Sequence, residues 1–86
     1  MLTKLAWTPR AWSDYLHWQS QDKKMLKRIN RVVDDTRYNP FTGIGKPEQL
    51  QANLSGLWSR RIDAQHRLVY EVENDTLIII SCRYHY

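Results

Sequence analysis

Residues 56–86 read GLWSRRI-DAQ-HRLVYEV-END-TLIIISCRYHY. The three longer runs, 56–62, 66–72 and 76–86, are rich in β-branched and aromatic residues, which favour strands. The two short runs between them hold small and polar residues typical of turns. This pattern predicts an antiparallel meander of three strands, around which the rest of the chain is organised.

The predicted strands have one apolar side and one polar side. Successive strand residues point to opposite faces of a sheet, so even and odd positions separate. The even positions are expected to form the core face, with Arg60 as the exception: Trp58, Ile62, Leu68, Tyr70, Val72, Ile78, Ile80, Cys82 and Tyr84. The odd positions are expected to form the outer face: Ser59, Arg61, Arg67, Glu71, Ser81, Arg83 and His85. A slip of one residue would bury the arginines, so the register is well specified.

The outer face of this meander is a candidate phosphate-binding surface. It carries Arg61, Arg67, Arg83 and His85, and no Asp or Glu lies between residues 76 and 86 to neutralise the last two. The alternative is an ordinary solvated strand face with a frayed terminal histidine. Both interpretations remain open on this pattern alone.

Charge is distributed unevenly along the 86 residues, which are long enough for one domain, 1–86, with one small core. Residues 1–50 contain nine Lys and Arg against five Asp and Glu, whereas residues 51–86 contain four of each. The formal charge of +4 therefore comes entirely from the first part of the chain. Such localised basicity predicts a polyanionic partner.

The single cysteine, Cys82, rules out an internal disulfide and predicts an inert core thiol in a reducing compartment. No apolar run approaches the roughly 20 residues of a membrane span, and no signal-peptide pattern is present. We therefore expect a cytoplasmic protein without a membrane partner. Three scattered histidines and one cysteine do not have metal-site spacing, so no metal or cofactor is expected.

The N-terminal half reads as one short strand, 2–7, followed by two helices. Thr8 and Pro9 predict a helix that runs to about Gln19, and Ser20 or Asp22 can start a second helix that runs to about Tyr38. The expected apolar stripe of the first helix is Trp12, Tyr15, Leu16 and Trp18. That of the second helix is Met25, Leu26, Ile29, Val32, Val33 and Thr36. His17 is interpreted as a surface or partly buried histidine.

The second helix also carries a basic cluster outside its apolar stripe: Lys23, Lys24, Lys27, Arg28 and Arg31. Asp34 and Asp35 lie near its end, so its charges oppose the helix dipole. This arrangement favours a cluster that serves a binding partner, with a solvated helix face as the alternative.

A loop is predicted over residues 39–47, because it holds two prolines and two glycines. Its glycine spacing is not that of a P-loop. Residues 48–50 are expected to form a short edge strand, and residues 51–55 a turn into the meander.

Four segments of the chain strongly resemble the Txe/YoeB toxins of the RelE superfamily: 45–48, 53–62, 66–70 and 82–86. The resemblance extends over nearly the whole length. It implies an α+β, two-layer RelE-like fold, β-α-α-β-β-β-β, with two N-terminal helices packed on one face of a mainly antiparallel four- to five-stranded sheet.

The resemblance also implies the toxin of a type II toxin–antitoxin system. Such a toxin is expected to be a metal-independent endoribonuclease that cleaves mRNA on the ribosome, in the aminoacyl-tRNA (A) site of the small subunit. It is also expected to be inhibited by a YefM-type antitoxin and to be a possible homodimer. Family members often have Pro and Lys near Gln49 and Gln51, so one auxiliary RNA contact is in doubt here.

Residue roles follow from matching positions. Glu48 is expected to act as general base, His85 as general acid and Arg67 as the transition-state cation. The supporting residues are Lys46, Arg61, Arg83 and Tyr86, and the basic cluster is expected to contact ribosomal RNA. The strand alternation independently places Arg61, Arg67 and His85 on one face, but it says nothing of Glu48.

Two rival functions remain on sequence grounds. One is a non-catalytic basic RNA- or DNA-binding module, and the other is an interaction module for an acidic partner. Neither gives a reason for a base and an acid beside a cationic patch.

Overall fold

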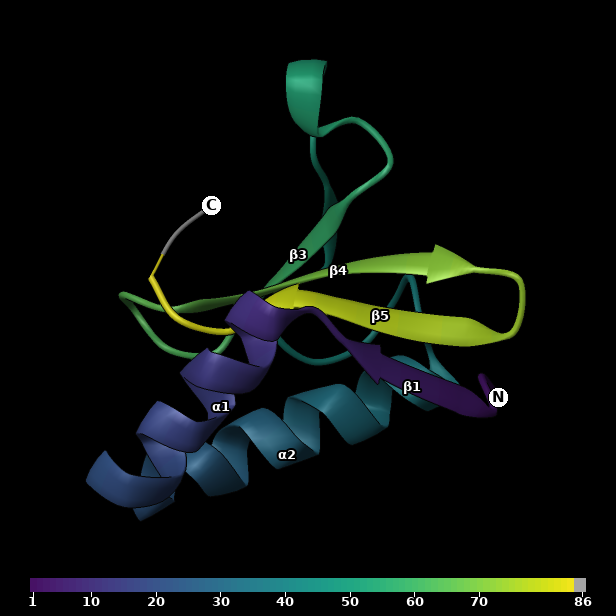
Figure 1. The fold of residues 1–86 in the computed structure, drawn as a ribbon. Coiled ribbons are helices and arrows are strands. Elements are labelled where there is room, and N and C mark those ends of the chain that lie inside the picture. The colour runs from purple at the N-terminus through teal and green to yellow at the C-terminus, as the bar shows by residue number, and fades with distance from the viewer. Residues whose placement is uncertain (85–86) are drawn as a thin grey trace.

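The computed structural model describes residues 1–84. Its elements are β1 (Lys4–Trp7), α1 (Pro9–Gln21), α2 (Lys23–Tyr38), β2 (Glu48–Gln49), a 3-10 turn η1 (Ala52–Leu54), β3 (Trp58–Arg61), β4 (Arg67–Glu73) and β5 (Thr76–Ser81). The strands form a five-stranded sheet in the order β1-β5-β4-β3-β2, in which only β1 and β5 are parallel. Both helices lie on one face of the sheet (Figure 1). The predicted α+β, two-layer architecture is confirmed.

The helix starts follow the predicted caps. Thr8 is extended, and its hydroxyl accepts a hydrogen bond from the Ala11 backbone N–H, with Pro9 at the first helical position. Asp22 ends α1 and starts α2, because its carboxylate accepts from the backbone N–H of Met25. The first helix runs to Gln21, two residues beyond the predicted end.

The buried side of α1 differs from the predicted apolar stripe. Ala11, Asp14 and Trp18 are buried, whereas Trp12 and Leu16 are 48% and 42% exposed. The reason is the contact between α1 and the end of β5. There Asp14 accepts from the Cys82 backbone N–H at 3.1 Å, and the Trp18 indole donates to the Cys82 carbonyl at 2.9 Å. These polar contacts set the rotation of α1, which an apolar pattern does not reveal.

The second helix buries the face that its sequence predicts. Ile29, Val32, Val33 and Thr36 are buried, and Met25 and Leu26 pack against the core at its edge. The Thr36 hydroxyl donates to the Val32 carbonyl at 2.7 Å, so its buried polar group is satisfied.

The apolar alternation of β5 is the reverse of the prediction over residues 77–80. Leu77 and Ile79 are fully buried, whereas Ile78 and Ile80 are only half-buried. The cause is a register shift against β4, since Tyr70 pairs with Ile79 but Val69 pairs with Ser81. Ile80 is therefore an extra residue in β5, and such a bulge changes the face to which later residues point.

After the bulge, Cys82 returns to the core side, as predicted, and it is fully buried. Burial, with the nearby Asp14 carboxylate, raises the pKa of the Cys82 thiol to about 12. The thiol therefore stays protonated at neutral pH, which agrees with an inert core cysteine.

Arg60 fits the alternation after all, because it is fully buried on the core side of β3. Its guanidinium donates to the Asp35 carboxylate at 2.7 Å and to the Tyr70 hydroxyl at 3.2 Å. It also donates to three backbone carbonyls of the loop that follows α2: those of Asn39, Thr42 and Ile44. Burial alone would raise the pKa of Asp35, but hydrogen bonds from Arg60 and from the Ile44 N–H outweigh it and lower that pKa.

The loop from residue 39 to residue 45 is thus wrapped around Arg60. Two glycines permit its close approach to the sheet. A Cβ at Gly43 would collide with the Asp35 carboxylate, and one at Gly45 would lie 2.6 Å from the Arg61 carbonyl. Both glycines also have positive φ, 118° and 79°. The loop therefore delivers the chain to β2 along a defined path.

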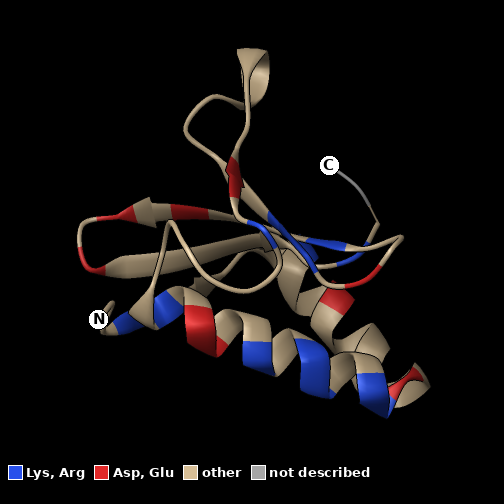
Figure 2. Cartoon of the chain, turned by 180° about the vertical axis from the view of Figure 1, so that it is seen from behind, with Lys and Arg blue, Asp and Glu red and all other residues tan. Residues whose placement is uncertain are grey.

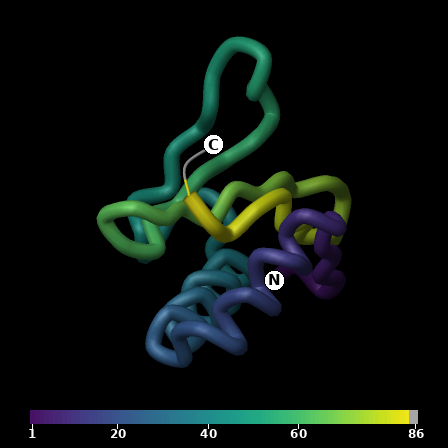
Figure 3. Tube along the Cα trace, turned by 60° about the vertical axis from the view of Figure 1, so that its left-hand side comes forward, coloured from purple at the N-terminus to yellow at the C-terminus, as the bar shows by residue number. Residues whose placement is uncertain are grey.

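Residues 50–57, between β2 and β3, project away from the helices and the sheet (Figure 3). Within residues 1–84, no helix combines the length and the apolar character that a membrane crossing requires.

Candidate active site

The predicted base and the predicted cation lie together on the face of the sheet that the helices do not cover. Glu48 pairs across β2 and β3 with Ser59, and Arg61 pairs across β3 and β4 with Arg67. Since cross-strand partners share a face, these side chains lie on one side of the sheet. The guanidinium of Arg67 lies 3.8 Å from the Glu48 carboxylate. The structure therefore places Glu48 beside Arg67, which strand alternation in the meander alone did not.

Two arginines face each other at this site. Like charges placed directly opposite each other are unfavourable in a sheet, yet Arg61 and Arg67 are cross-strand partners. Arg67 is largely covered, whereas Glu48 and Arg61 are exposed. The backbone N–H of Arg61 donates to the Gly45 carbonyl at 2.7 Å. The backbone of the next residue, the exposed Lys46, therefore lies close to that of Arg61. Arg67 is thus the cation beside the Glu48 carboxylate, and Arg61 and Lys46 are exposed on neighbouring backbone.

The strand alternation predicts that the centre of this face is exposed to solvent, but the structure buries it. Ser59, Val69 and Ser81 are all buried. The Ser59 hydroxyl is fully enclosed, and no hydrogen-bond partner for it is found in the part of the chain that the structure describes. The exposed part of the face is thus limited to the charged residues at its end.

The remaining predicted residues lie at the C-terminal end of the chain. His85 and Tyr86 lie outside the described residues. Arg83 lines a groove of about 480 Å³ with His17, Trp18, His66 and Tyr84, and its guanidinium lies 4.6 Å from the centre of the Tyr84 ring. Arg83 thus contacts an aromatic groove beside α1, a placement that the strand pattern did not indicate.

The basic cluster of α2 lines a second, larger groove of about 660 Å³. Figure 2 shows Lys and Arg following α2 and a separate group on the sheet. Lys24, Lys27, Arg28 and Arg31 line the groove, together with Ile44 and Gly45 of the loop. Lys23 is exposed but does not line it.

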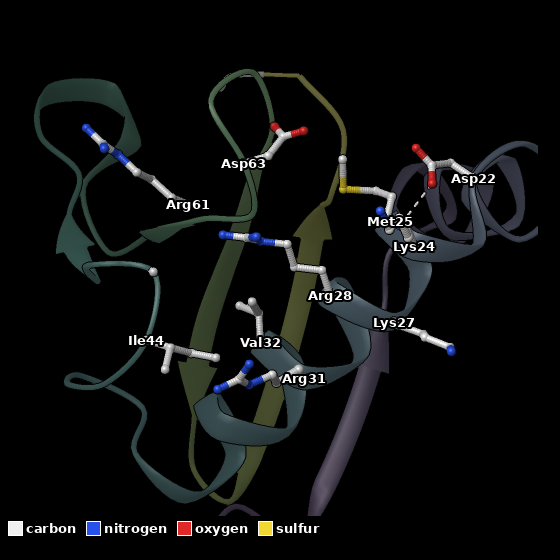
Figure 4. Close-up of a pocket in the computed structure, with 11 residues that line it drawn as sticks. Asp22, Lys24, Met25, Lys27, Arg28, Arg31, Val32, Ile44, Arg61 and Asp63 are labelled. Carbon is white, nitrogen blue, oxygen red and sulfur yellow. Dashed lines mark hydrogen bonds between the residues drawn. The ribbon is translucent and has the colours of Figure 1, made fainter.

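Arg28 and Arg31 extend from α2 toward the loop and the sheet, whereas Lys27 points away from them (Figure 4). Arg61 also lines this groove. Arg61, the last residue of β3, is therefore common to this groove and to the predicted catalytic face.

Within residues 1–84, no three His, Cys, Asp or Glu side chains come together as metal ligands. The Glu48 carboxylate instead lies beside the Arg67 guanidinium, with Arg61 on the adjoining strand. Such a set can bind an anion and accept a proton, which are two of the requirements for phosphodiester chemistry.

Comparison with known proteins identifies the relatives of this chain. The family described as "YoeB-like toxin of bacterial type II toxin-antitoxin system" matches residues 7–86. The chain belongs to this family. It is 58% identical to Toxin YoeB of Escherichia coli strain K12 over 83 residues, which cover 96% of this chain and 99% of that toxin. The predicted membership in the Txe/YoeB toxin family is confirmed. The chain is therefore the toxin of a type II toxin–antitoxin system.

Solved structures agree with the family. The YoeB/ParE toxin from Agrobacterium tumefaciens superposes with a TM-score of 0.94 at 46% identity, covering 96% of this chain and 99% of that chain. The toxin chain of a YoeB–YefM complex from Staphylococcus aureus gives 0.90 at 45% identity, covering 96% of this chain and 97% of that chain. The fold described above is therefore that of the YoeB toxins.

Proposed function

We propose that this YoeB-like toxin is an endoribonuclease that cleaves mRNA on the ribosome. The observation that supports the proposal is the Glu48 carboxylate 3.8 Å from the Arg67 guanidinium, on a face where Arg61 stands opposite Arg67. A proton acceptor therefore lies beside guanidinium groups whose fork of donors suits the oxygens of a phosphate. A phosphodiester with an adjacent hydroxyl supplies both an anion for these cations and a proton for the carboxylate.

In the proposed reaction, Glu48 accepts the proton of the ribose 2′-hydroxyl, and the oxygen attacks the adjacent phosphorus. Arg67, with Arg61 and Lys46, stabilises the negative charge that develops on the phosphorane. His85 donates a proton to the departing 5′-oxygen. The products are a 2′,3′-cyclic phosphate and a free 5′-hydroxyl. No step in this scheme requires a metal ion, and Arg83 and Tyr86 are assigned supporting contacts.

The test is to incubate the toxin with a defined message, with and without programmed ribosomes, and to map both new ends. The proposal expects cleavage that depends on ribosomes and leaves a 2′,3′-cyclic phosphate or 3′-phosphate. Binding without any new ends would favour the alternative, a non-catalytic basic RNA-binding module. Glu48→Gln is the control for a contaminating nuclease, since it keeps the fold and the shape of the side chain.

The basic cluster of α2 is proposed to contact ribosomal RNA. All five of its side chains are exposed, and four line the groove beside Arg61. Replacing Lys24, Lys27 and Arg28 by Gln should weaken ribosome binding and flatten its salt dependence, because fewer counterions are released. Lys4→Gln, an exposed lysine on β1, is the matched control. An unchanged salt slope in the triple variant would exclude this role.

The antitoxin is proposed to be of the YefM type, as in the complex from Staphylococcus aureus. An acidic segment that folds on binding can form ion pairs with exposed arginines such as Arg61. We expect it to displace or cover residues 83–86, which amide exchange of free and bound toxin would show as changed protection. A homodimer of the free toxin is a further prediction, to be tested by sedimentation across a concentration series.

A further inference from the structure

The turn between β3 and β4 holds the backbone of Tyr84. The ring nitrogen Nδ1 of His66 accepts a hydrogen bond from the Tyr84 N–H at 2.8 Å. The next residue, Arg67, begins β4, and its backbone N–H donates to the Tyr84 carbonyl at 3.0 Å. Both peptide groups of Tyr84 are therefore bonded to consecutive residues of one strand and its turn, although Tyr84 is itself exposed.

His66 is itself held firmly in this turn. The Asp63 carboxylate accepts from the His66 backbone N–H at 2.7 Å, and the His66 carbonyl accepts from the Ile62 N–H at 2.9 Å. The imidazole stands edge-on to the Trp18 ring, with ring centres 4.8 Å apart. The acceptor nitrogen thus has a fixed position relative to the core.

The conformation of Tyr84 shows why such an anchor is needed. Its φ is 63°, in the left-handed region that a bulky non-glycine residue rarely adopts. Such a conformation persists only where the surroundings determine it, and residues of this kind cluster at functional sites. Two residues earlier, Asp14 and Trp18 fix the Cys82 peptide groups at 3.1 Å and 2.9 Å. The chain is therefore fixed on both sides of Arg83.

We propose that His66 is a positioning residue for the general acid His85. The inference rests on the proposed ribonuclease function, because His85 is the acid only in that reaction. His85 follows Tyr84 directly in the chain, so the hydrogen bond from the Tyr84 N–H to His66 acts one residue before the proposed acid. His66 acts through this bond and takes no proton from the substrate. The groups that face its ring are His17, Trp18, Arg83 and Tyr84, which line the same groove.

Two substitutions separate the hydrogen bond from the packing of the ring. Asn can place an oxygen where Nδ1 stands, so His66→Asn keeps the acceptor but loses most of the ring. Phe keeps a ring against Trp18 but has no acceptor, so His66→Phe removes the bond. We expect His66→Phe to lower the single-turnover cleavage rate on ribosomes about 10- to 100-fold, the order of loss for a misplaced catalytic group. We expect His66→Asn to stay within a few fold of wild type, and ribosome affinity to change less than about threefold in both. The opposite order, with Phe active and Asn impaired, would overturn the proposal in favour of a packing role.

A substrate with a 5′-thio leaving group tests whether His66 acts through the acid. A thiolate leaves without protonation, so this substrate should restore most of the rate lost in His66→Phe. It should restore little in Glu48→Gln, which is the matched control. If the thio substrate does not rescue His66→Phe, the residue does not act through His85 and the proposal is wrong.

Amide exchange at Tyr84 provides a readout without RNA. The Tyr84 N–H should exchange faster in His66→Phe than in wild type or His66→Asn, while amides of the buried residues Tyr70 and Ile79 stay protected. Unchanged Tyr84 exchange in His66→Phe overturns the anchor whatever the cleavage data show. If Tyr84 exchanges faster in His66→Phe but the wild-type toxin cuts no RNA, the anchor is supported and the proposed ribonuclease function is wrong.

Discussion

Arg60 and Arg61 are neighbours in β3, yet their surroundings have little in common. The Arg60 side chain is fully buried, and its guanidinium makes five hydrogen bonds, to Asp35, to Tyr70 and to the carbonyls of Asn39, Thr42 and Ile44. Arg61 points to the other face, is exposed, and stands opposite Arg67. A guanidinium has five N–H donors, so Arg60 is saturated from within the protein.

The comparison teaches how to separate a structural arginine from one that binds a ligand. A buried charge is tolerated only with a partner and with its hydrogen bonds satisfied, and Arg60 meets that condition through the loop that it shapes. Arg61 is exposed and stands opposite Arg67, and a like-charge pair of this kind is by itself unfavourable in a sheet. Such an arrangement fits a role in binding an anion from outside.

The largest expected effect lies on the exposed side. Glu48→Gln removes the proposed base and should lower single-turnover cleavage on ribosomes by about 10²–10⁴-fold, with the free energy of unfolding nearly unchanged, because Glu48 is an exposed side chain on a two-residue edge strand. Arg67→Gln should also lower the cleavage rate strongly. Stopped reactions with saturating ribosomes would measure both rates. Glu71→Gln, on the same strand as Arg67, is the control and should cleave normally.

The next effect concerns the buried side. Arg60→Gln removes the charged partner of the Asp35 carboxylate and the guanidinium donors of three loop carbonyls, so we expect a loss of about 3–5 kcal/mol in the free energy of unfolding. Arg61→Gln should change that free energy by less than about 0.5 kcal/mol. Urea titration of the two variants gives both values. Similar losses at the two positions would remove the distinction between them.

The smallest effect is a dependence of stability on acid. The pKa of Asp35 is lowered in the folded protein from its ordinary value of 3.8. The stabilising contribution of this carboxylate is therefore complete above that value and is lost as pH falls below it toward the folded pKa. Asp35→Asn should flatten this part of the pH profile of unfolding, whereas exposed Asp34→Asn should leave its shape closer to wild type. A profile unaffected by Asp35→Asn would argue against the Arg60 pair as its source.

The sequence predicts the two-layer fold because its signals are local. Caps at Thr8 and Asp22, the periodic stripe of α2 and the alternation of β3 and β4 are all present in short windows. The alternation fails in β5, since a bulge at Ile80 depends on pairing with β4 and leaves no mark in the β5 sequence. It fails in α1 because Asp14 and Trp18 bond the distant Cys82 backbone.

The candidate site is predicted in part for the same reason. Alternation finds Arg61 and Arg67, because their spacing in adjacent strands determines their face. Glu48 is found only through the resemblance, since its place depends on how the loop around Arg60 delivers β2 to the sheet. The anchor at His66 could not be found, because a hydrogen bond between residues 66 and 84 is a tertiary contact.

One substitution in the message tests the central claim most directly. A 2′-deoxy nucleotide at the cleaved position removes the proposed nucleophile and keeps the phosphate that Arg61 and Arg67 are proposed to bind. On ribosomes carrying this message, the toxin should bind as to the all-ribose message and leave that phosphodiester intact, while an all-ribose message is cut in parallel. Cleavage of the 2′-deoxy position at the normal rate would contradict attack by the 2′-hydroxyl and the role assigned to Glu48.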